Sequence, residues 1–259
     1  MRGSLPPATS VVGGINGLSR AASARLAAEI AAAAAREQQA RFTVPPHFQG
    51  KTITHVDLAG DRKVIALTFD DGPWPESTNA ILYILRKHDV RATFFLLGRN
   101  IRNFPERARQ VAEHGHAIAN HSWSHPYHQQ TPASAAGQID NTDIWIEQAT
   151  GVRSQLFRPP GGYLHNGMAA YAAGKGQVVV MWSGDSKDYY ASSAKIASNV
   201  INTARPGGIV LLHDGGGDRD RTINALPQII TTLRQQGYEF VTVPELLELH
   251  HQQMQATKG

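Results

Sequence analysis

The chain has 259 residues, of which 41% are hydrophobic and 18% charged, with a formal net charge of +4 and no cysteine. This composition is typical of one packed globular domain with an extension, and it excludes disulfides, thiolate metal ligands and a cysteine nucleophile. The basic residues are scattered along the chain, so a nucleic acid partner is not expected. No apolar run approaches the roughly 20 residues that cross a bilayer, so no membrane-spanning segment is expected either.

The first 50 residues are predicted to form an extension. Residues 1–19 are rich in Gly, Ser, Pro and Ala and read as a flexible leader, residues 21–41 have high helix propensity, and a Pro-Pro pair within residues 42–50 marks a linker. The start, Met-Arg-Gly-Ser, has no apolar signal core, so we expect any signal peptide or anchor to lie outside this chain. We predict an extension of residues 1–50 and a main domain of residues 51–259.

From Lys63 onward, short apolar β-branched segments alternate with helical segments. The predicted strands are residues 64–69, 92–97, 116–120, 156–158, 178–182, 209–213 and 238–243. The predicted helices are residues 77–88, 105–114, 133–149, 167–173, 192–204 and 222–236. This alternation predicts parallel strands with crossover helices, which an open doubly wound sheet and a barrel both satisfy.

Polar residues at the strand ends favour the barrel. Five predicted strands end in, or are followed directly by, such residues: Asp70 and Asp71, His121 and His125, Arg158, Asp185, and His213. Several strands that point polar groups toward one face are typical of a (β/α) barrel. With about seven parallel strands, we predict an α/β fold that is a distorted or incomplete (β/α) barrel with an N-terminal helical extension.

Two of these motifs together predict a metal site. Asp70 and Asp71 are adjacent at a strand end, and His121 and His125 are four residues apart. Each motif alone also fits a solvated turn or loop. Two His and one carboxylate, however, form a ligand set for a catalytic divalent ion with open positions, and the second carboxylate is then free to act as a base.

The loop of residues 157–163 combines two prolines with Gly161 and Gly162, so it is either a backbone N–H donor for an oxyanion or only a stiff loop. The loop of residues 182–190 carries acids that can pair with Arg158 and aromatic residues that can line a ligand site, although solvated acids are the alternative. His213 ends an apolar strand and, near a metal, can protonate a leaving amine.

In order and wording, these segments resemble the NodB-homology polysaccharide deacetylases, also called carbohydrate esterase family four, from about Lys63 to Leu249. The motifs are Thr-Phe-Asp-Asp-Gly-Pro, His-Ser-Trp-Ser-His, Arg-Pro-Pro and Leu-Leu-His. The resemblance implies a metal-dependent hydrolase of the cell envelope that removes N-acetyl groups from an amino-sugar polymer, either peptidoglycan or chitin and its oligosaccharides. It also implies an exported protein with residues 51–259 as the catalytic domain and a polysaccharide as its partner.

The resemblance also implies a role for each matching residue. Asp70 is the base, His213 the acid, and Arg158 orients the base, itself tethered by Asp185 or Asp188. The implied metal ligands are Asp71, His121 and His125, and the implied substrate contacts are Gly161, Tyr163, Trp182 and Leu211. Many relatives have an aromatic residue after the Pro-Pro pair, where this chain has Gly161 and Gly162, so we expect this wall of the groove to differ.

The expected cofactor is one divalent ion, zinc first, with cobalt, nickel or manganese also compatible with His and Asp ligands. Three alternatives remain at this stage. The machinery could cleave O-acetyl esters of xylan or another glycan, the chain could be a non-catalytic glycan-binding relative, or the metal could be structural. The last is disfavoured because structural zinc sites usually have four protein ligands.

Overall fold

The computed structural model describes residues 20–40 and 42–257, so the predicted leader of residues 1–19 and Arg41 lie outside the described residues. The chain divides into two compact units, Met1–Glu37 and Gln38–Gly259. Helix α1 (Arg20–Ala40) agrees with the predicted N-terminal helix, and an exposed Arg25–Glu29 ion pair joins two of its turns. The domain boundary at residues 50 and 51 stays a prediction.

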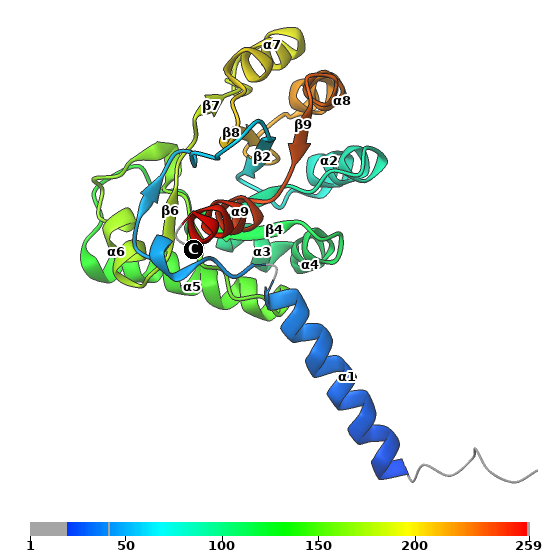
Figure 1. Cartoon of the computed structure of the whole chain (residues 1–259). Helices are drawn as coiled ribbons and strands as arrows, with labels where there is room; N and C mark the ends of the chain where they lie inside the picture. Colours follow the sequence, from blue (N-terminus) through cyan, green and yellow to red (C-terminus); the bar gives the residue numbers. More distant parts are fainter. Residues whose placement is uncertain (1–19, 41, 258–259) are drawn as a thin grey trace, which may run out of the picture. The chain divides into compact units, whose positions relative to one another are not determined.

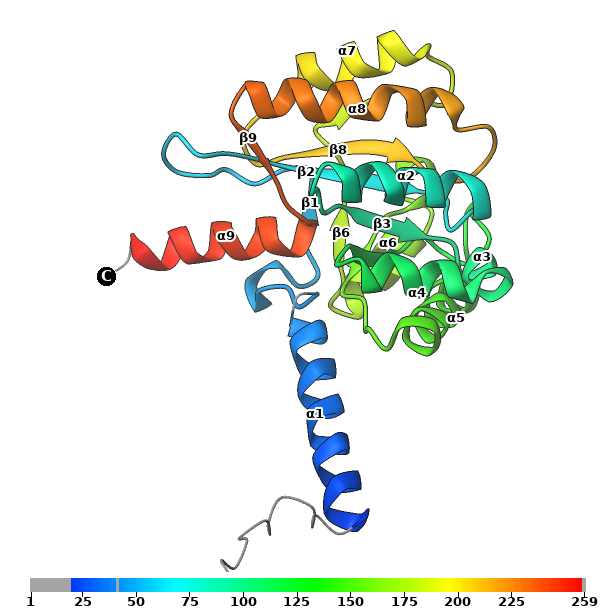
Figure 2. The ribbon, with the colours of Figure 1, turned by 90° about the vertical axis from the view of Figure 1, so that its right-hand side faces the viewer.

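A single sheet of nine parallel strands forms the centre of the second unit. Its order is β1-β6-β5-β4-β3-β2-β8-β7, and β9 pairs with the start of β2. Figure 2 shows β8, β2 and β3 side by side and pointing the same way. The strands are β1 (Thr52–Ile53), β2 (Lys63–Asp70), β3 (Thr93–Leu96), β4 (Ala117–Asn120), β5 (Leu156–Phe157), β6 (Val178–Val180), β7 (Gly184–Asp185), β8 (Gly208–His213) and β9 (Tyr238–Phe240).

Helices surround the sheet, which confirms the prediction of a distorted (β/α) barrel (Figure 1). In Figure 2, α7 and α8 lie above the strands, α2 lies in front of them, and α4 and α5 lie below. The crossover helices bury apolar stripes at helical spacing, as the sequence predicts. They are α2 (Pro75–Lys87), α3 (Gly98–Asn103), α4 (Pro105–Glu113), α5 (Pro132–Thr150), α6 (Met168–Gly174), α7 (Ser193–Thr203) and α8 (Asp220–Gln235), followed by α9 (Val243–Ala256).

The barrel is distorted between β6 and β7. β6 pairs with β5, whereas β7, which begins after the three residues 181–183, pairs with β8. One bent segment therefore connects the two halves of the sheet. The sequence predicts a single strand over residues 178–182, whereas the structure ends this strand at Val180 and adds β7, which the sequence analysis did not predict.

Two apolar layers hold the fold together. One lies between the sheet and the outer helices and includes Leu67, Phe94 and Ile229. The other fills the interior of the barrel and includes Phe95 and Leu246. Residues from the predicted linker join this second layer, because Val44 and Phe48 are buried there and residues 46–48 form a 3-10 turn. The linker segment therefore packs as part of the core.

Helix α9 lies at the end of the sheet where the strands begin (Figure 2). Its start corrects the sequence prediction, since strand β9 ends at Phe240 and the helix begins at Val243. Thr242 and Glu245 form a reciprocal capping box, which stabilises the first turn. Leu246 and Leu247 are fully buried against the barrel interior.

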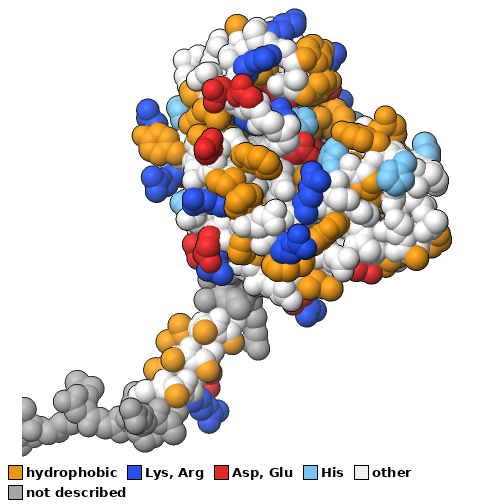
Figure 3. Space-filling model, turned by 180° about the vertical axis from the view of Figure 1, so that it is seen from behind, with side chains coloured by type: hydrophobic (Ala, Val, Ile, Leu, Met, Phe, Trp, Pro, Cys, Tyr) orange, Lys and Arg blue, Asp and Glu red, His pale blue; other side chains and the backbone are white. Residues whose placement is uncertain are grey.

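Positive and negative side chains are interspersed with hydrophobic ones on the face shown in Figure 3. Within residues 20–40 and 42–257, no helix has the length and apolar character needed to span a membrane.

Candidate active site

The side chains predicted from the strand ends meet in one cavity of about 400 Å³ at the C-terminal ends of the strands. Strand β2 ends in Asp70, β7 in Asp185 and β8 in His213, while β4 is followed by His121. Nine of the predicted site residues line this cavity: Asp70, Asp71, His121, His125, Gly161, Trp182, Asp185, Leu211 and His213.

The three predicted metal ligands lie close together. One ligand atom each from Asp71, His121 and His125 lies within 4.8 Å of the other two. Asp71 Oδ1 is 3.3 Å from His125 Nε2 and 3.5 Å from His121 Nε2, and this buried oxygen has no hydrogen-bond partner among the described residues. A buried unpaired carboxylate oxygen facing two imidazole nitrogens fits a divalent cation.

The backbone around these ligands is strained and held from outside. Asp71 and His125 have positive φ angles of 75° and 62°, in a region that residues other than glycine rarely adopt. Asn100 of α3 donates to the Asp71 carbonyl at 2.8 Å, and Gln138 of α5 accepts the N–H groups of Trp123 and Ser124. The loops are therefore shaped by neighbouring helices before any ligand binds.

His121 is prepared to ligate as a neutral imidazole. Burial lowers its pKa to about 3, although the charge of Asp71 opposes the change. Its Nδ1 lies 2.8 Å from the carbonyl oxygen of Arg158, which fixes the ring and leaves Nε2 toward Asp71.

Asp70 is paired with Arg158 in the interior. Arg158 Nη1 donates to Asp70 Oδ1 at 2.7 Å and to Thr68 Oγ1 at 2.8 Å, and the guanidinium is fully buried. Burial raises the pKa of the Asp70 carboxyl, and Arg158 partly offsets the change. Asp70 Oδ2 faces His121 Nε2 at 3.6 Å, so it is the oxygen on the metal side.

The predicted tether of Arg158 is wrong. Its remaining hydrogen bonds go to the carbonyl oxygens of Val180 and Met181, at 3.0 and 3.2 Å, and neither Asp185 nor Asp188 is a partner. With Asp70, Thr68 and two carbonyls as acceptors, the guanidinium needs no second carboxylate. Asp185 lines the cavity and accepts the Lys187 N–H.

Asp188 instead contacts His213. Its Oδ1 lies 2.7 Å from His213 Nδ1, and its Oδ2 accepts the His213 backbone N–H at 2.8 Å and the Thr222 hydroxyl at 2.8 Å. Burial alone would lower the pKa of His213, but the hydrogen bond and charge of Asp188 outweigh it, so the pKa is raised. His213 thus keeps its proton more readily than an ordinary histidine.

The Gly161–Gly162 pair allows three aromatic rings to converge. Both glycines have positive φ, and a Cβ on Gly161 would lie 2.8 Å from Tyr127 and 2.9 Å from Tyr163. A Cβ on Gly162 would lie 2.9 Å from Trp182. The N–H groups of Gly162 and Tyr163 donate to the carbonyl oxygens of Pro159 and Pro160 within the turn, and the N–H of Gly161 takes no part in these two hydrogen bonds. Tyr163 borders an adjoining cavity rather than this one.

Sequence reasoning missed several residues of the cavity. Tyr127, Tyr189, Gly216 and Arg219 also line it. Tyr127 follows the second histidine of its motif by two residues, and its ring packs edge-on against His125 at 4.9 Å. Its position beside a ligand was the available signal. Arg219 carries no comparable signal, because it lies beyond the last motif, at the N-cap of α8.

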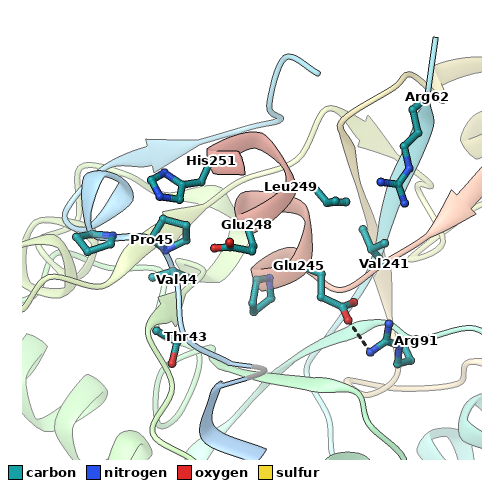
Figure 4. Close-up of a pocket in the computed structure, with 12 residues that line it drawn as sticks. Thr43, Val44, Pro45, Arg62, Arg91, Val241, Glu245, Glu248, Leu249 and His251 are labelled. Atoms are coloured by element: carbon teal, nitrogen blue, oxygen red, sulfur yellow. Dashed lines mark ion pairs between the residues drawn. The ribbon is translucent and has the colours of Figure 1, made fainter. Parts of the chain in front are cut away.

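A larger cavity, of about 670 Å³, lies at the opposite end of the strands (Figure 4). In Figure 4, Glu245 of α9 points toward Arg91, and the two form an ion pair at 2.5 Å. Arg62 is paired with Glu239. Among the described residues, the three that can share a metal ion line the other cavity, so the chemistry is expected there.

Known proteins share both the sequence and the architecture. A model of the polysaccharide deacetylase family matches residues 57–180. Over 206 residues the chain is 37% identical to a peptidoglycan-N-acetylglucosamine deacetylase of Bacillus cereus, which covers 75% of this chain and 93% of the relative. The chain belongs to the polysaccharide deacetylase family. The prediction of a hydrolase of this class is thereby confirmed.

Two further similarities support this family assignment. This chain is 38% identical to a peptidoglycan-N-acetylmuramic acid deacetylase of Bacillus subtilis, over 74% of this chain and 40% of that longer protein. The crystal structure of a peptidoglycan N-acetylglucosamine deacetylase bound to a naphthyl N-hydroxybenzamide superposes with a TM-score of 0.72 and 33% identity, covering 77% of this chain and 94% of that one. The family is metal-dependent, in keeping with the site of Asp71, His121 and His125.

Proposed function

We propose that this deacetylase removes N-acetyl groups from the amino sugars of peptidoglycan and releases acetate, acting outside the cytoplasmic membrane where that polymer lies. The main support is that three groups meet at one cavity: the cluster of Asp71, His121 and His125, the buried carboxylate of Asp70, and His213 with its partner Asp188. The names of the bacillary relatives support the choice of substrate.

The proposed cofactor is one zinc ion held by Asp71, His121 and His125. Such an ion would supply Lewis-acid chemistry there, which would polarise the acetamide carbonyl and lower the pKa of the attacking water. The unpaired Asp71 Oδ1 and the neutral His121 supply the donor set.

The chain's own groups then move the protons. Asp70 accepts a proton from the attacking water through Oδ2, because Oδ1 is bonded to Arg158. The Gly161 N–H donates to the developing oxyanion. His213 donates its proton to the sugar nitrogen as the C–N bond breaks, which leaves acetate and a free amine. Leu211 and Trp182 form the apolar wall beside the acetyl group.

The test is acetate release from peptidoglycan, from chitopentaose and from acetylxylan, with protein stripped by a chelator and then supplied with zinc or cobalt. We expect activity to vanish on stripping and to return with metal. His125→Gln should prevent the return, whereas His128→Gln, an exposed neighbour outside the cavity, should not. Release from acetylxylan alone would point to O-acetyl esters. No release from any of the three, with metal bound, would point to a glycan-binding protein.

A further inference from the structure

Arg219 is a charged residue of the catalytic cavity that the proposed mechanism does not use. It exposes only 8% of its surface and lines the same cavity as the metal triad. Its Nε donates to the Gly215 carbonyl oxygen at 2.5 Å. The side chain is therefore fixed by its inner nitrogen, and the two terminal nitrogens of the guanidinium are left for other partners.

Gly216 keeps this guanidinium accessible. A Cβ on Gly216 would lie 2.7 Å from Asp71 Oδ2 and 3.3 Å from Arg219 Nη2. The missing side chain therefore opens the cavity at a point next to both the metal-side carboxylate and the arginine. A ligand bound at Asp71, His121 and His125 would therefore lie close to Arg219.

The other charges of the site already have partners. Asp70 is paired with Arg158, and His213 with Asp188. Asp185, which also lines the cavity, accepts a backbone N–H and forms no ion pair with Arg219. Across the described part of the chain, no carboxylate lies within ion-pair distance of Arg219.

Arg219 has little exposure and no ion-pair partner, and the Asp71 carboxylate beside Gly216 is assigned to the metal. A ligand that supplies an anion would therefore stabilise this cation. The planar guanidinium fork matches the geometry of a carboxylate, which it can bind through two parallel hydrogen bonds. The cavity volume of about 400 Å³ lies within the range of small-molecule sites, roughly 300–1,000 Å³.

We propose that Arg219 binds a carboxylate on the acetamido sugar that is being deacetylated, so that the preferred substrate is an acidic amino sugar. N-acetylmuramic acid has this chemistry, because a lactyl ether, which carries a carboxylate, is attached to the ring carbon next to the one that bears the acetamido group. This inference rests on the proposed function and narrows its substrate. A sugar whose lactyl carboxyl is blocked as an amide lacks the charge that Arg219 recognises.

The experiment compares kcat/KM for acetate release from three tetrasaccharides. They are a peptide-free alternating N-acetylglucosamine and N-acetylmuramic acid strand, the same strand with its carboxyls converted to methylamides, and chitotetraose. We expect the free acid to be the best substrate. Arg219→Gln should raise KM for the acid by about tenfold or more, because a charge-assisted hydrogen bond is lost. The KM values for the two neutral substrates should change less.

Arg221→Gln is the matched control. It removes the same charge two residues away, from an exposed side chain that donates to the Tyr190 carbonyl and lies outside the cavity. The preference for the acid should persist in this variant. If Arg219→Gln does not fold, Arg219→Lys provides the test, because a lysine keeps the charge and should retain part of the preference.

Equal losses on all three substrates would overturn the proposal, since Arg219 would then only position the Gly215 loop. Equal use of acid and methylamide by the unchanged protein would also overturn it, while leaving the proposed function intact. If no substrate releases acetate, the proposed function fails. Calorimetric binding of the acid and its methylamide then decides the inference, and equal affinities would reject it.

Discussion

His213 and Asp188 form a two-point contact in which one carboxylate accepts both the ring Nδ1–H and the backbone N–H of the histidine, at 2.7 and 2.8 Å. The contact fixes the ring tautomer and raises the pKa of His213 against the effect of burial. Asp188→Asn removes the charge, so the pKa of His213 should fall and the protonated acid should be lost at lower pH. We expect kcat to drop by about 10²–10⁴-fold at neutral pH.

The pH profile tests the cause of that loss. In the unchanged protein, activity should decline as pH rises through the raised pKa of His213, and in Asp188→Asn the same decline should begin at lower pH. Asp57→Asn makes the same chemical change on a side chain that is 87% exposed and should leave the profile unchanged. An unshifted alkaline limb in Asp188→Asn would show that Asp188 does not control the acid.

Arg158→Met should destabilise the protein, because it leaves the buried carboxylate of Asp70 without its cation. We expect the metal-free protein to lose about 3–5 kcal/mol of unfolding free energy at neutral pH. The loss should shrink as pH falls, since the unpaired Asp70 can take up a proton. Denaturant titrations of this variant and of Arg158→Met with Asp70→Asn check the idea, and the double variant should recover stability. Two equally unstable variants would contradict it.

Gly161→Ala should harm activity more than backbone strain alone explains. Gly161 has a φ of 61°, and an added Cβ would push against Tyr127 and Tyr163 at under 3 Å. We expect kcat/KM to fall about 10- to 100-fold through displacement of these rings and of the Gly161 N–H. Gly60→Ala is the control, since Gly60 has a φ of 78° and no atom within 4 Å of the added Cβ. Similar activity in both variants would rule out a role for this turn.

His116 should make the fold sensitive to acid. It is buried, its Nδ1 accepts the Ala92 N–H, and burial lowers its pKa to about 3. Below the ordinary pKa of 6.5, His116 gains a proton in the unfolded chain but not in the folded chain, so the protein becomes less stable as the pH is lowered. Between pH 6.5 and 5 this should cost about 2 kcal/mol. Unfolding curves of His116→Gln, which cannot be protonated, should lack this component, and parallel pH curves would refute it.

The central strands β2 and β8 could be predicted because each is an apolar run that ends in a polar residue. Lys63–Asp70 is the clearest case, since seven of its eight residues are buried and the last is a catalytic candidate. Short elements lack such a pattern. Helix α3 has six residues and β7 has two, too few for a periodicity to appear. The start of α9 was readable, because Thr242 and Glu245 have capping-box spacing, but the apolar run before it favoured a longer strand.

The clustering of Asp71, His121 and His125 could be predicted because these residue types at this spacing are typical of a metal site, while their role as ligands stays a prediction. The true roles of Asp185 and Asp188 could not be predicted, since both acids have a suitable charge to tether Arg158 and both lie in one loop. The role of each acid depends on which side chains lie beside it in the folded chain, and Asp188 lies beside the His213 ring. Arg219 was missed for the same reason, because only the folded chain brings it beside Asp71 and Gly216.

The bend between β6 and β7 affects more than the shape of the sheet. Where the chain leaves β6, the carbonyl oxygens of Val180 and Met181 accept hydrogen bonds from Arg158. A regular strand through residues 178–185 would turn such carbonyls toward a neighbouring strand and leave the guanidinium short of acceptors. The irregular wall of the barrel therefore helps to hold the buried Arg158 guanidinium next to Asp70. A regular strand here would weaken the support of the predicted base without altering any residue that touches substrate.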